Sequence, residues 1–241
     1  MIDWTRVLVT VPAFNEAENL PRVIPEIRAA APGAAILVVD DCSRDETRAV
    51  ARGLGVTVVS HPVNLGAGGA IGTGFRYAVE KGYDLAVNVD GDGQHDPRHL
   101  AAVVSPVAGG QADVSIGSRY VEKTAYRAPL LRRTGMLLFS WVTTRLAGVA
   151  IHDTTSGYRA YSREVMRHCM ADLPHDFPDA PFLIHLARSG FRLVEVPVEM
   201  RAREFGQSFY TFTKSLYYPY KNLLASAIVA LRVKSRGRRR P

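Results

Sequence analysis

The sequence contains few cysteines. Among its 241 residues only Cys42 and Cys169 are cysteines, and they lie far apart in the chain. Neither belongs to a Cys-x-x-Cys pair, so the sequence indicates neither a disulfide framework nor a zinc site built from thiolates. So few cysteines are typical of a reducing compartment, and we therefore expect a cytoplasmic protein.

Long hydrophobic runs are also missing. No segment reaches the roughly 18 to 20 consecutive apolar residues that span a bilayer, and the longest candidate, residues 223–233, is too short. The first residues, MIDWTRVLVTVPAFNE, lack the basic, apolar and small-residue parts of a secretory leader, so secretion is not expected. The hydrophobic content of 47% is nonetheless sufficient for a full globular core.

Acidic residues are absent from the end of the chain. After Leu231 there are six basic residues and no acid, whereas the remainder has 24 basic and 23 acidic residues. The formal charge of +7 therefore comes mainly from the tail, and a nearly neutral body argues against nucleic acid as a partner. A basic tail after a short apolar segment is typical of contact with lipid headgroups, although a solvated terminus has the same composition. We expect peripheral contact with the inner face of a membrane.

Apolar strands alternate with amphipathic helices in the first half of the chain. The predicted strands are residues 6–11, 35–39, 56–60 and 84–89, and the predicted helices between them are residues 15–31, 43–54 and 68–82. This order predicts an α/β fold with a mostly parallel sheet flanked by helices. The later pattern is less regular, with strands predicted at 113–117, 159–161 and 191–198 and helices at 130–146 and 182–189.

Polar clusters follow three of the predicted strands, at residues 12–16, 40–45 and 90–96. Ligands of such sheets bind outside the carboxyl ends of the strands, so we expect the three clusters to converge on one crevice. The second cluster also has a structural interpretation. Ser43 followed by Glu46 has the spacing of a capping box at a helix start.

Asp90, Gly91 and Asp92 are the most informative part of these clusters. Two carboxylates follow an apolar strand with only a glycine between them. Mg²⁺ and Mn²⁺ prefer oxygen ligands and often keep open positions for substrate phosphates. Gly91 permits a sharp turn and the close approach of a ligand. The triplet therefore predicts a cation site for a phosphorylated ligand, although Asp and Gly are also common in ordinary turns.

Two further segments bear on this site. The glycine-rich residues 66–74 enter a predicted helix, where backbone N–H groups bind phosphate, but they match neither G-x-G-x-x-G nor the Walker pattern. A nicotinamide dehydrogenase is therefore disfavoured. His95 and His99 lie four residues apart, but Pro97 separates them and no third zinc ligand is identifiable. We interpret His95 as a neighbour of a bound diphosphate.

Six segments, taken in order, resemble family 2 glycosyltransferases of the GT-A fold, and especially their dolichyl-phosphate mannose synthase branch. The segments are VPAFNEAENL, VVDDCSRDET, HPVNLGAGGAIGTGF, VDGDGQHDP, GSRY and DTTSGYR, and the resemblance extends over residues 7–208. It implies a GT-A domain of residues 1–208. Residues 209–241 would then form an aromatic and amphipathic C-terminal segment with a basic tail.

The resemblance also implies roles for individual residues. The implied donor-binding residues are Pro12, Phe14, Glu16, Asp40, Asp41, Asp90, Gly91 and Arg119. The implied ligands of Mg²⁺ or Mn²⁺ on the donor diphosphate are Asp90, Asp92 and Gln94. The implied acceptor or phosphate-binding residues are Asp153, Arg201, Arg203 and Ser208. Relatives commonly have a lysine after that serine, but Phe209 stands here, which leaves Arg203 or Lys214 as substitutes.

The implied reaction is inverting transfer of a hexose from a nucleotide-diphosphate sugar to a polyprenyl monophosphate, with Asp179 and Asp92 as catalytic residues. Asp179 resembles the position of a carboxylate base. A lipid phosphate is already ionised and needs no strong base, whereas a hydroxyl of a soluble natural product or saccharide does, and both acceptors remain open. A sugar-nucleotide pyrophosphorylase is disfavoured because its glycine-rich basic loop is missing. A non-catalytic nucleotide-binding module is disfavoured by the intact Asp-x-Asp pair.

Overall fold

The structure is a computed structural model that describes residues 2–121, 140–171, 179–202 and 212–233. These residues form a seven-stranded sheet with the order β3-β2-β1-β4-β6-β5-β7. Only β6 runs antiparallel to its neighbours, β4 and β5. The predicted fold, a mostly parallel sheet flanked by helices, is confirmed. The strands are β1 Val7–Ala13, β2 Ala35–Asp40, β3 Thr57–Ser60, β4 Leu85–Asn88, β5 Val114–Ser118, β6 Arg159–Ser162 and β7 Leu193–Pro197.

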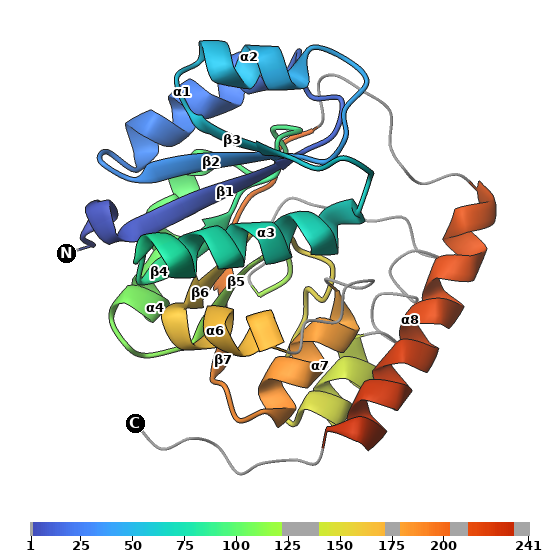
Figure 1. Ribbon diagram of the computed structural model, residues 1–241. Coiled ribbons are helices and arrows are strands. Elements are labelled where there is room, and N and C mark those ends of the chain that lie inside the picture. The colour runs from blue at the N-terminus through green and yellow to red at the C-terminus, as the bar shows by residue number, and fades with distance from the viewer. Residues whose placement is uncertain (1, 122–139, 172–178, 203–211, 234–241) are drawn as a thin grey trace.

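β1 lies inside the sheet because its side chains are apolar on both faces. Val7, Val9 and Val11 pack in one core cluster, and Leu8 packs in the other. Each cluster joins the sheet to one layer of helices, so the sheet is covered on both faces (Figure 1). The first layer contains α1 Leu20–Ala30, α2 Thr47–Gly53 and α4 Leu100–Ala108, and the second contains α3 Gly66–Lys81, α6 Arg163–Ala171 and α7 Ala180–Arg188. Short 3-10 turns are η1 Trp4–Arg6 and η2 Pro97–His99.

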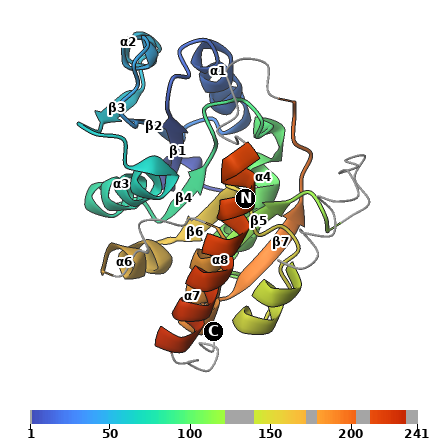
Figure 2. The ribbon, with the colours of Figure 1, turned by 90° about the vertical axis from the view of Figure 1, so that its right-hand side faces the viewer.

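α8, Phe212–Arg232, packs against α7 outside these two layers (Figure 2). At its end, Nε of Arg188 donates a hydrogen bond of 2.7 Å to the carbonyl oxygen of Val233, and Nη1 lies 3.4 Å from that of Leu146. Leu146 belongs to the helical residues 140–147. A guanidinium group is favourable there, because carbonyl groups at a helix C-terminus lack partners within the helix. None of the described helices is both long enough and apolar enough to cross a membrane.

Two helices begin later than the sequence predicts. The helix predicted at 15–31 begins at Leu20, with Asn19 as its N-cap residue. Asn15 has a left-handed backbone with a φ of 56°, which excludes it from a helix. The helix predicted at 43–54 begins at Thr47, and the capping-box interpretation is wrong. The hydroxyl of Ser43 accepts a hydrogen bond of 3.0 Å from the N–H of Asn15, which joins the two loops after β1 and β2.

Candidate active site

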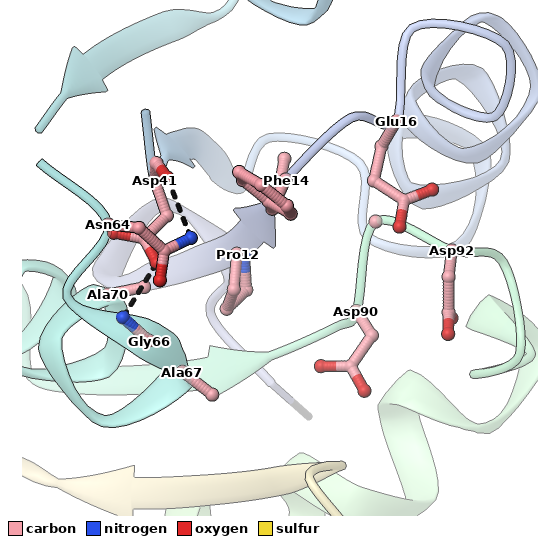
Figure 3. Close-up of a pocket in the computed structure, with 12 residues that line it drawn as sticks. Pro12, Phe14, Glu16, Asp41, Asn64, Gly66, Ala67, Ala70, Asp90 and Asp92 are labelled. Carbon is pink, nitrogen blue, oxygen red and sulfur yellow. Dashed lines mark hydrogen bonds between the residues drawn. The ribbon is translucent and has the colours of Figure 1, made fainter. Parts of the chain in front are cut away.

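A cavity of about 420 Å³ lies beyond the carboxyl ends of β1, β2 and β4 (Figure 3). All three polar clusters contribute to it, so their predicted convergence is confirmed. Its volume falls in the range of small-molecule sites. The lining residues are Pro12, Ala13, Phe14, Glu16, Asp41, Asn64, Gly66, Ala67, Ala70, Asp90, Gly91 and Asp92.

Asp41 organises one wall of the cavity. Its Oδ1 accepts hydrogen bonds of 2.8 Å from Nδ1 of His61 and from the N–H of Leu65, and its Oδ2 accepts one of 2.7 Å from the N–H of Gly66. The carboxylate thus binds the first turn of α3, where negative charge is stabilising. A carboxylate offers about four acceptor positions, so these three bonds leave capacity for a ligand donor. Asp40 supports the same loop by accepting from the N–H of Ser43 at 3.0 Å.

Glu16 and its neighbours form the opposite wall. The carboxylate of Glu16 accepts a hydrogen bond of 2.6 Å from Nδ2 of Asn19, and its N–H donates to the hydroxyl of Thr47 at 2.7 Å. These bonds fix the loop that follows β1. Phe14 lies between this wall and Asp41 (Figure 3). An aromatic ring flanked by carboxylates is suited to a nucleoside, which has an apolar face and polar edges.

Asp90 and Asp92 project to the same side of the loop after β4 (Figure 3). The side chain of Asp90 is 44% exposed, and Oδ1 of Asp92 accepts a hydrogen bond of 3.0 Å from the N–H of Gln94. The N–H of Gly91 donates to the carbonyl oxygen of Pro12 at 3.1 Å. A Cβ atom on Gly91 would lie 3.0 Å from that oxygen, so only glycine lets the tip pack this closely on β1.

The two carboxylates fit a divalent cation. The described residues contain no group of three or more His, Cys, Asp or Glu side chains that would hold an ion by itself. Mg²⁺, however, is commonly held by one or two carboxylates together with substrate phosphates. A Cβ atom on Gly157 would lie 3.3 Å from both oxygens of Asp90, so glycine at this position keeps a side chain away from the carboxylate.

His95 lies behind Asp90. Its ring is 3% exposed, and its Nδ1 accepts a hydrogen bond of 3.0 Å from the N–H of Asp90. The ring also stacks on Tyr158, with ring centroids 4.8 Å apart. The ring is thus buried against Asp90, and the interpretation of His95 as a neighbour of the diphosphate stays a prediction.

Arg119 and Asp153 form a buried ion pair. Nε and Nη2 of Arg119 donate to the two carboxylate oxygens of Asp153, each at 2.7 Å. Burial raises the pKa of Asp153, but the hydrogen bonds and charge of Arg119 outweigh it, so the pKa lies below its usual value. Glu195 fixes the loop by accepting from the N–H groups of His152 and Asp153, at 2.9 and 2.8 Å. The structure thus joins two residues that the resemblance places on the donor and acceptor sides.

Asp179 directly precedes α7 and is half-buried. Burial raises its pKa to about 6; the charge of Arg159 acts in the opposite direction, and the charges of Asp153 and Asp90 raise the pKa further. Asp179 therefore interacts electrostatically with the candidate metal ligand Asp90. A carboxyl group with a pKa near 6 is suited to proton transfer close to neutral pH.

Arg201 is held by two carboxylates. Its Nη1 donates to Glu26 at 2.6 Å and its Nη2 donates to Asp96 at 2.9 Å. Burial raises the pKa of Asp96, but hydrogen bonds from Arg98 and Arg201 lower it to about 2. A phosphate that binds Arg201 must therefore compete with two carboxylates. Arg203 and Ser208 lie outside the described residues, as do the side chains of residues 212–220, including Lys214.

Several residues of this site have no strong signal in the sequence. His61 joins Asp41 to α3, with its Nε2 at 2.8 Å from the hydroxyl of Thr73, and Asn64 lines the cavity. Their only signal is their place in the segment HPVNLG, which the resemblance includes. The contacts of Gly157 and Tyr158 with His95 and Asp90 have no local signal, because they depend on the path of a distant loop.

The chain matches known proteins along most of its length. Residues 8–170 match the family described as Glycosyl transferase family 2. A polyprenol monophosphomannose synthase of Mycolicibacterium smegmatis is 40% identical over 215 residues, which cover 84% of this chain and 80% of the relative. An undecaprenyl-phosphate mannosyltransferase of Micrococcus luteus is 35% identical over 226 residues, which cover 84% of this chain and 86% of the relative.

A solved structure shares the fold. The crystal structure of glucosyl-3-phosphoglycerate synthase from Mycobacterium tuberculosis in complex with Mn²⁺, uridine-diphosphate-glucose and phosphoglyceric acid matches with a TM-score of 0.68. The two proteins are 21% identical, and the match covers 93% of this chain and 79% of the other. The chain therefore belongs to glycosyl transferase family 2 and is a glycosyltransferase with the GT-A fold.

Proposed function

We propose that this glycosyltransferase moves a hexose from a nucleotide-diphosphate sugar to a polyprenyl monophosphate, with inversion at the sugar and with Mg²⁺ or Mn²⁺ as cofactor. The observation that carries the proposal is the pair Asp90 and Asp92 beside a nucleotide-sized cavity at the edge of the sheet. The relatives support the acceptor, since their names specify polyprenol monophosphomannose synthesis and undecaprenyl-phosphate mannosyl transfer. The similar structure supports the donor and cation, since it contains Mn²⁺ and uridine-diphosphate-glucose.

On the donor side, the two walls of the cavity bind the nucleoside. The base and ribose contact Pro12, Phe14 and Glu16, and the carboxylate of Asp41 accepts a further hydrogen bond from the base or ribose. Asp90 and Asp92 hold the cation, with Gln94 beside it. When bound, the cation offsets the negative charge that develops on the departing diphosphate. Gly91 lets the diphosphate approach the backbone.

Between the donor and acceptor sides, Asp153 holds Arg119 in a fixed orientation. The planar guanidinium group matches the geometry of phosphate oxygens, and Nη2 of Arg119 also donates to the hydroxyl of Thr155 at 2.9 Å, which helps to fix its orientation. Arg201, Arg203 and Ser208 are the further candidates for phosphate contacts. Asp179 is the candidate base. With a lipid phosphate its task is confined to orienting the acceptor or sugar, because that nucleophile arrives ionised.

We place the membrane contact on α8, within the C-terminal segment of residues 209–241 that follows the catalytic domain of residues 1–208. Asn222 and Ser226 are buried, whereas Leu224, Ile228 and Leu231 are 50%, 53% and 85% exposed. The exposed leucines and isoleucine follow one another at helical spacing, so they form an apolar stripe on the outer face of the helix. Such a stripe, followed by a basic tail, is suited to the cytoplasmic face of an anionic membrane.

The function is tested by the release of nucleoside diphosphate from UDP-, GDP- and TDP-sugars with Mn²⁺, with and without polyprenyl phosphate in detergent. We expect one donor to be consumed only when the lipid phosphate is present. Asp92→Ala should abolish release, and Asp84→Ala, a surface aspartate that pairs with Arg6, should not. If nucleoside diphosphate release instead depends on a soluble hydroxyl compound, that compound and not the polyprenyl phosphate is the acceptor. Consumption of a nucleoside triphosphate would indicate a pyrophosphorylase, and binding without turnover a non-catalytic module.

The membrane contact is tested separately with vesicles that contain anionic lipid. Leu224→Glu combined with Ile228→Glu should reduce co-sedimentation, because two charges would enter the apolar stripe. Met170→Glu is the matched control, since Met170 is 43% exposed but belongs to α6. Equal sedimentation of all three proteins would remove α8 from the proposal and leave the chemistry of the site untouched.

A further inference from the structure

The N–H group of Asp90 has its hydrogen-bond acceptor on a side chain. Nδ1 of His95 accepts this bond at 3.0 Å, and Nε2 of the same ring lies 3.5 Å from Oδ2 of Asp90. One imidazole therefore contacts both the backbone and the carboxylate of a single residue. A distance of 3.5 Å is too long for a strong hydrogen bond, so the backbone contact is the better defined of the two.

The hydrogen bond from Asp90 specifies one tautomer of the neutral His95 ring. Nδ1 must be unprotonated to accept from the N–H of Asp90, so the neutral ring has its proton on Nε2. That N–H faces the carboxylate of Asp90, where it is electrostatically favourable. The ring therefore contributes an acceptor to the backbone of Asp90 and a donor dipole to its side chain.

The ring itself has little freedom. It stacks on Tyr158 with an interplanar angle of 17°, and the hydroxyl of Tyr158 donates to the carbonyl oxygen of Asp96 at 3.1 Å. Burial raises the pKa of Tyr158, so this hydroxyl remains a donor. The backbone of His95 forms an isolated antiparallel β-bridge with Met200. The stacking on Tyr158 restricts the ring and the bridge restricts the backbone that carries it, so the ring can restrict Asp90 in turn.

We propose that His95 is a positioning residue that holds Asp90 in the orientation required for cation binding. This inference rests on the proposed function, in which Asp90 is a metal ligand. Groups that orient metal ligands typically change metal affinity by about 10- to 100-fold when they are removed. The Asp90 side chain is partly exposed and would otherwise sample several rotamers.

The test measures Mn²⁺ affinity directly, by water-proton relaxation of the full chain titrated with Mn²⁺ alone. His95→Phe keeps a ring for stacking on Tyr158 and removes both nitrogen atoms. We expect its affinity for Mn²⁺ to fall by about 10- to 100-fold. His95→Asn retains an acceptor for the N–H of Asp90, and its affinity should recover to within about fivefold of the original protein.

Matched variants separate positioning from folding. His99→Phe changes a second nearby histidine, which belongs to η2, accepts from the N–H of Glu199 at 3.2 Å and has no described contact with Asp90. Its Mn²⁺ affinity should stay within about twofold of the original. Binding of UDP or GDP in EDTA should be equal in all these proteins, because the base and ribose contacts do not involve His95. If His95→Phe does not fold, His95→Gln, which cannot place its amide at Nδ1, takes its place.

Asp90→Asn separates a failure of the positioning role of His95 from a failure of the metal site itself. If Asp90→Asn weakens Mn²⁺ binding and His95→Phe or His95→Gln does not, the inference is overturned and the proposed metal site stands. If Asp90→Asn leaves Mn²⁺ binding intact, the metal site of the proposed function itself is wrong. Weak binding by His95→Phe with recovery in His95→Asn supports the positioning role.

Discussion

Arg119 and Asp153 form a bidentate ion pair at the carboxyl end of β5, and the N–H of Arg119 also donates to Asp153, at 3.1 Å. The amino end of β5 has a counterpart, in which Arg192 donates to Asp113 through Nε, Nη2 and its N–H. β5 runs in the same direction as β4, because β6 is antiparallel to both. Only the first pair therefore lies at the edge that contains the candidate site.

Asp153→Asn should destabilise the fold and impair the reaction. Removal of one partner from a buried pair costs about 3–5 kcal/mol, because the other charge remains without compensation. Turnover should also fall, because Arg119 loses its orientation. Asp113→Asn should lower stability, by less because that pair is more exposed, and leave turnover unchanged. Urea unfolding and nucleoside diphosphate release measure the two effects, and equal turnover in both variants would remove Arg119 from the reaction.

The stability difference between the original protein and Asp153→Asn should depend on pH. The pKa of Asp153 is lowered in the folded state, so its charge contributes stability at pH values above the unfolded value of 3.8. This contribution is lost as the pH falls from 3.8 through the lower folded value. The difference in unfolding free energy should therefore be constant near neutral pH and shrink below pH 4. A difference that persisted in acid would assign the effect to packing.

Gly157→Ala should weaken cation binding with little loss of stability. The new Cβ atom would lie 3.3 Å from both carboxylate oxygens of Asp90, which must then move by a few tenths of an ångström. We expect about tenfold weaker Mn²⁺ binding, the lower end of the effect of misplacing a metal ligand. Gly53→Ala is the control, since its Cβ atom meets nothing within 4 Å on a helix, and it should raise stability by about 0.4–1 kcal/mol. Unchanged Mn²⁺ affinity in Gly157→Ala would show that the Asp90 carboxylate tolerates this displacement without loss of cation binding.

Hydrophobic patterns in the sequence predicted individual strands, but not how distant strands pair. The apolar runs of β1, β2 and β4 identified strands buried on both faces, and the structure places them next to one another. The insertion of β6 between β4 and β5 was not predictable, since its partners lie far from it in the sequence and their pairing is a tertiary property. α4 was not predicted either, because its sequence, LAAVVSPVA, is apolar along most of its length and contains Pro106.

The candidate site likewise contains residues that have a local sequence signal and contacts that do not. The acidic residues after β2 and β4 were identified because a strand end has a sequence signature. Their supporting partners were not identified, because they come from another part of the chain: His61 contacts Asp41 across 20 residues. Arg119 and Asp153 were both identified from the resemblance, but their pairing across 34 residues was not predicted. The sequence thus indicated the candidate site residues more clearly than the contacts that hold them in place.

Asp41→Asn should weaken nucleotide binding and lower stability. The amide has one acceptor atom instead of two, and it loses the charge that stabilises the first turn of α3. We expect a loss of about 1–2 kcal/mol in unfolding free energy and about tenfold in affinity for UDP or GDP measured in EDTA. Asp45→Asn is the control: Asp45 accepts from the N–H of Thr47 at the start of α2 but does not line the cavity. Asp45→Asn should lose stability and retain its affinity for UDP or GDP. If both variants lose stability and nucleotide affinity to the same extent, the role of Asp41 is structural.

Asp179→Asn should stabilise the protein at neutral pH in EDTA. Burial raises the folded pKa to about 6, above the ordinary value of 3.8, so the folded state binds the proton more tightly than the unfolded state. Ionisation therefore costs folding free energy as the pH rises from 3.8 to about 6, and asparagine avoids this cost. We expect a gain on the order of 1–3 kcal/mol at pH 7.5, with no gain below pH 3.8. A loss of stability at pH 7.5 would show that pairing with Arg159 outweighs burial.

The same variant distinguishes the two acceptor classes. An ionised lipid phosphate attacks the anomeric carbon without losing a proton, so Asp179→Asn should retain turnover within about tenfold of the original when polyprenyl phosphate is the acceptor. A hydroxyl must lose its proton as it attacks, and removal of its base typically costs about 10²- to 10⁴-fold. The measurement is nucleoside diphosphate release at saturating donor. A loss of 10²-fold or more with polyprenyl phosphate would mean that Asp179 takes part in the chemical step with that acceptor, by stabilising positive charge on the sugar ring rather than by removing a proton.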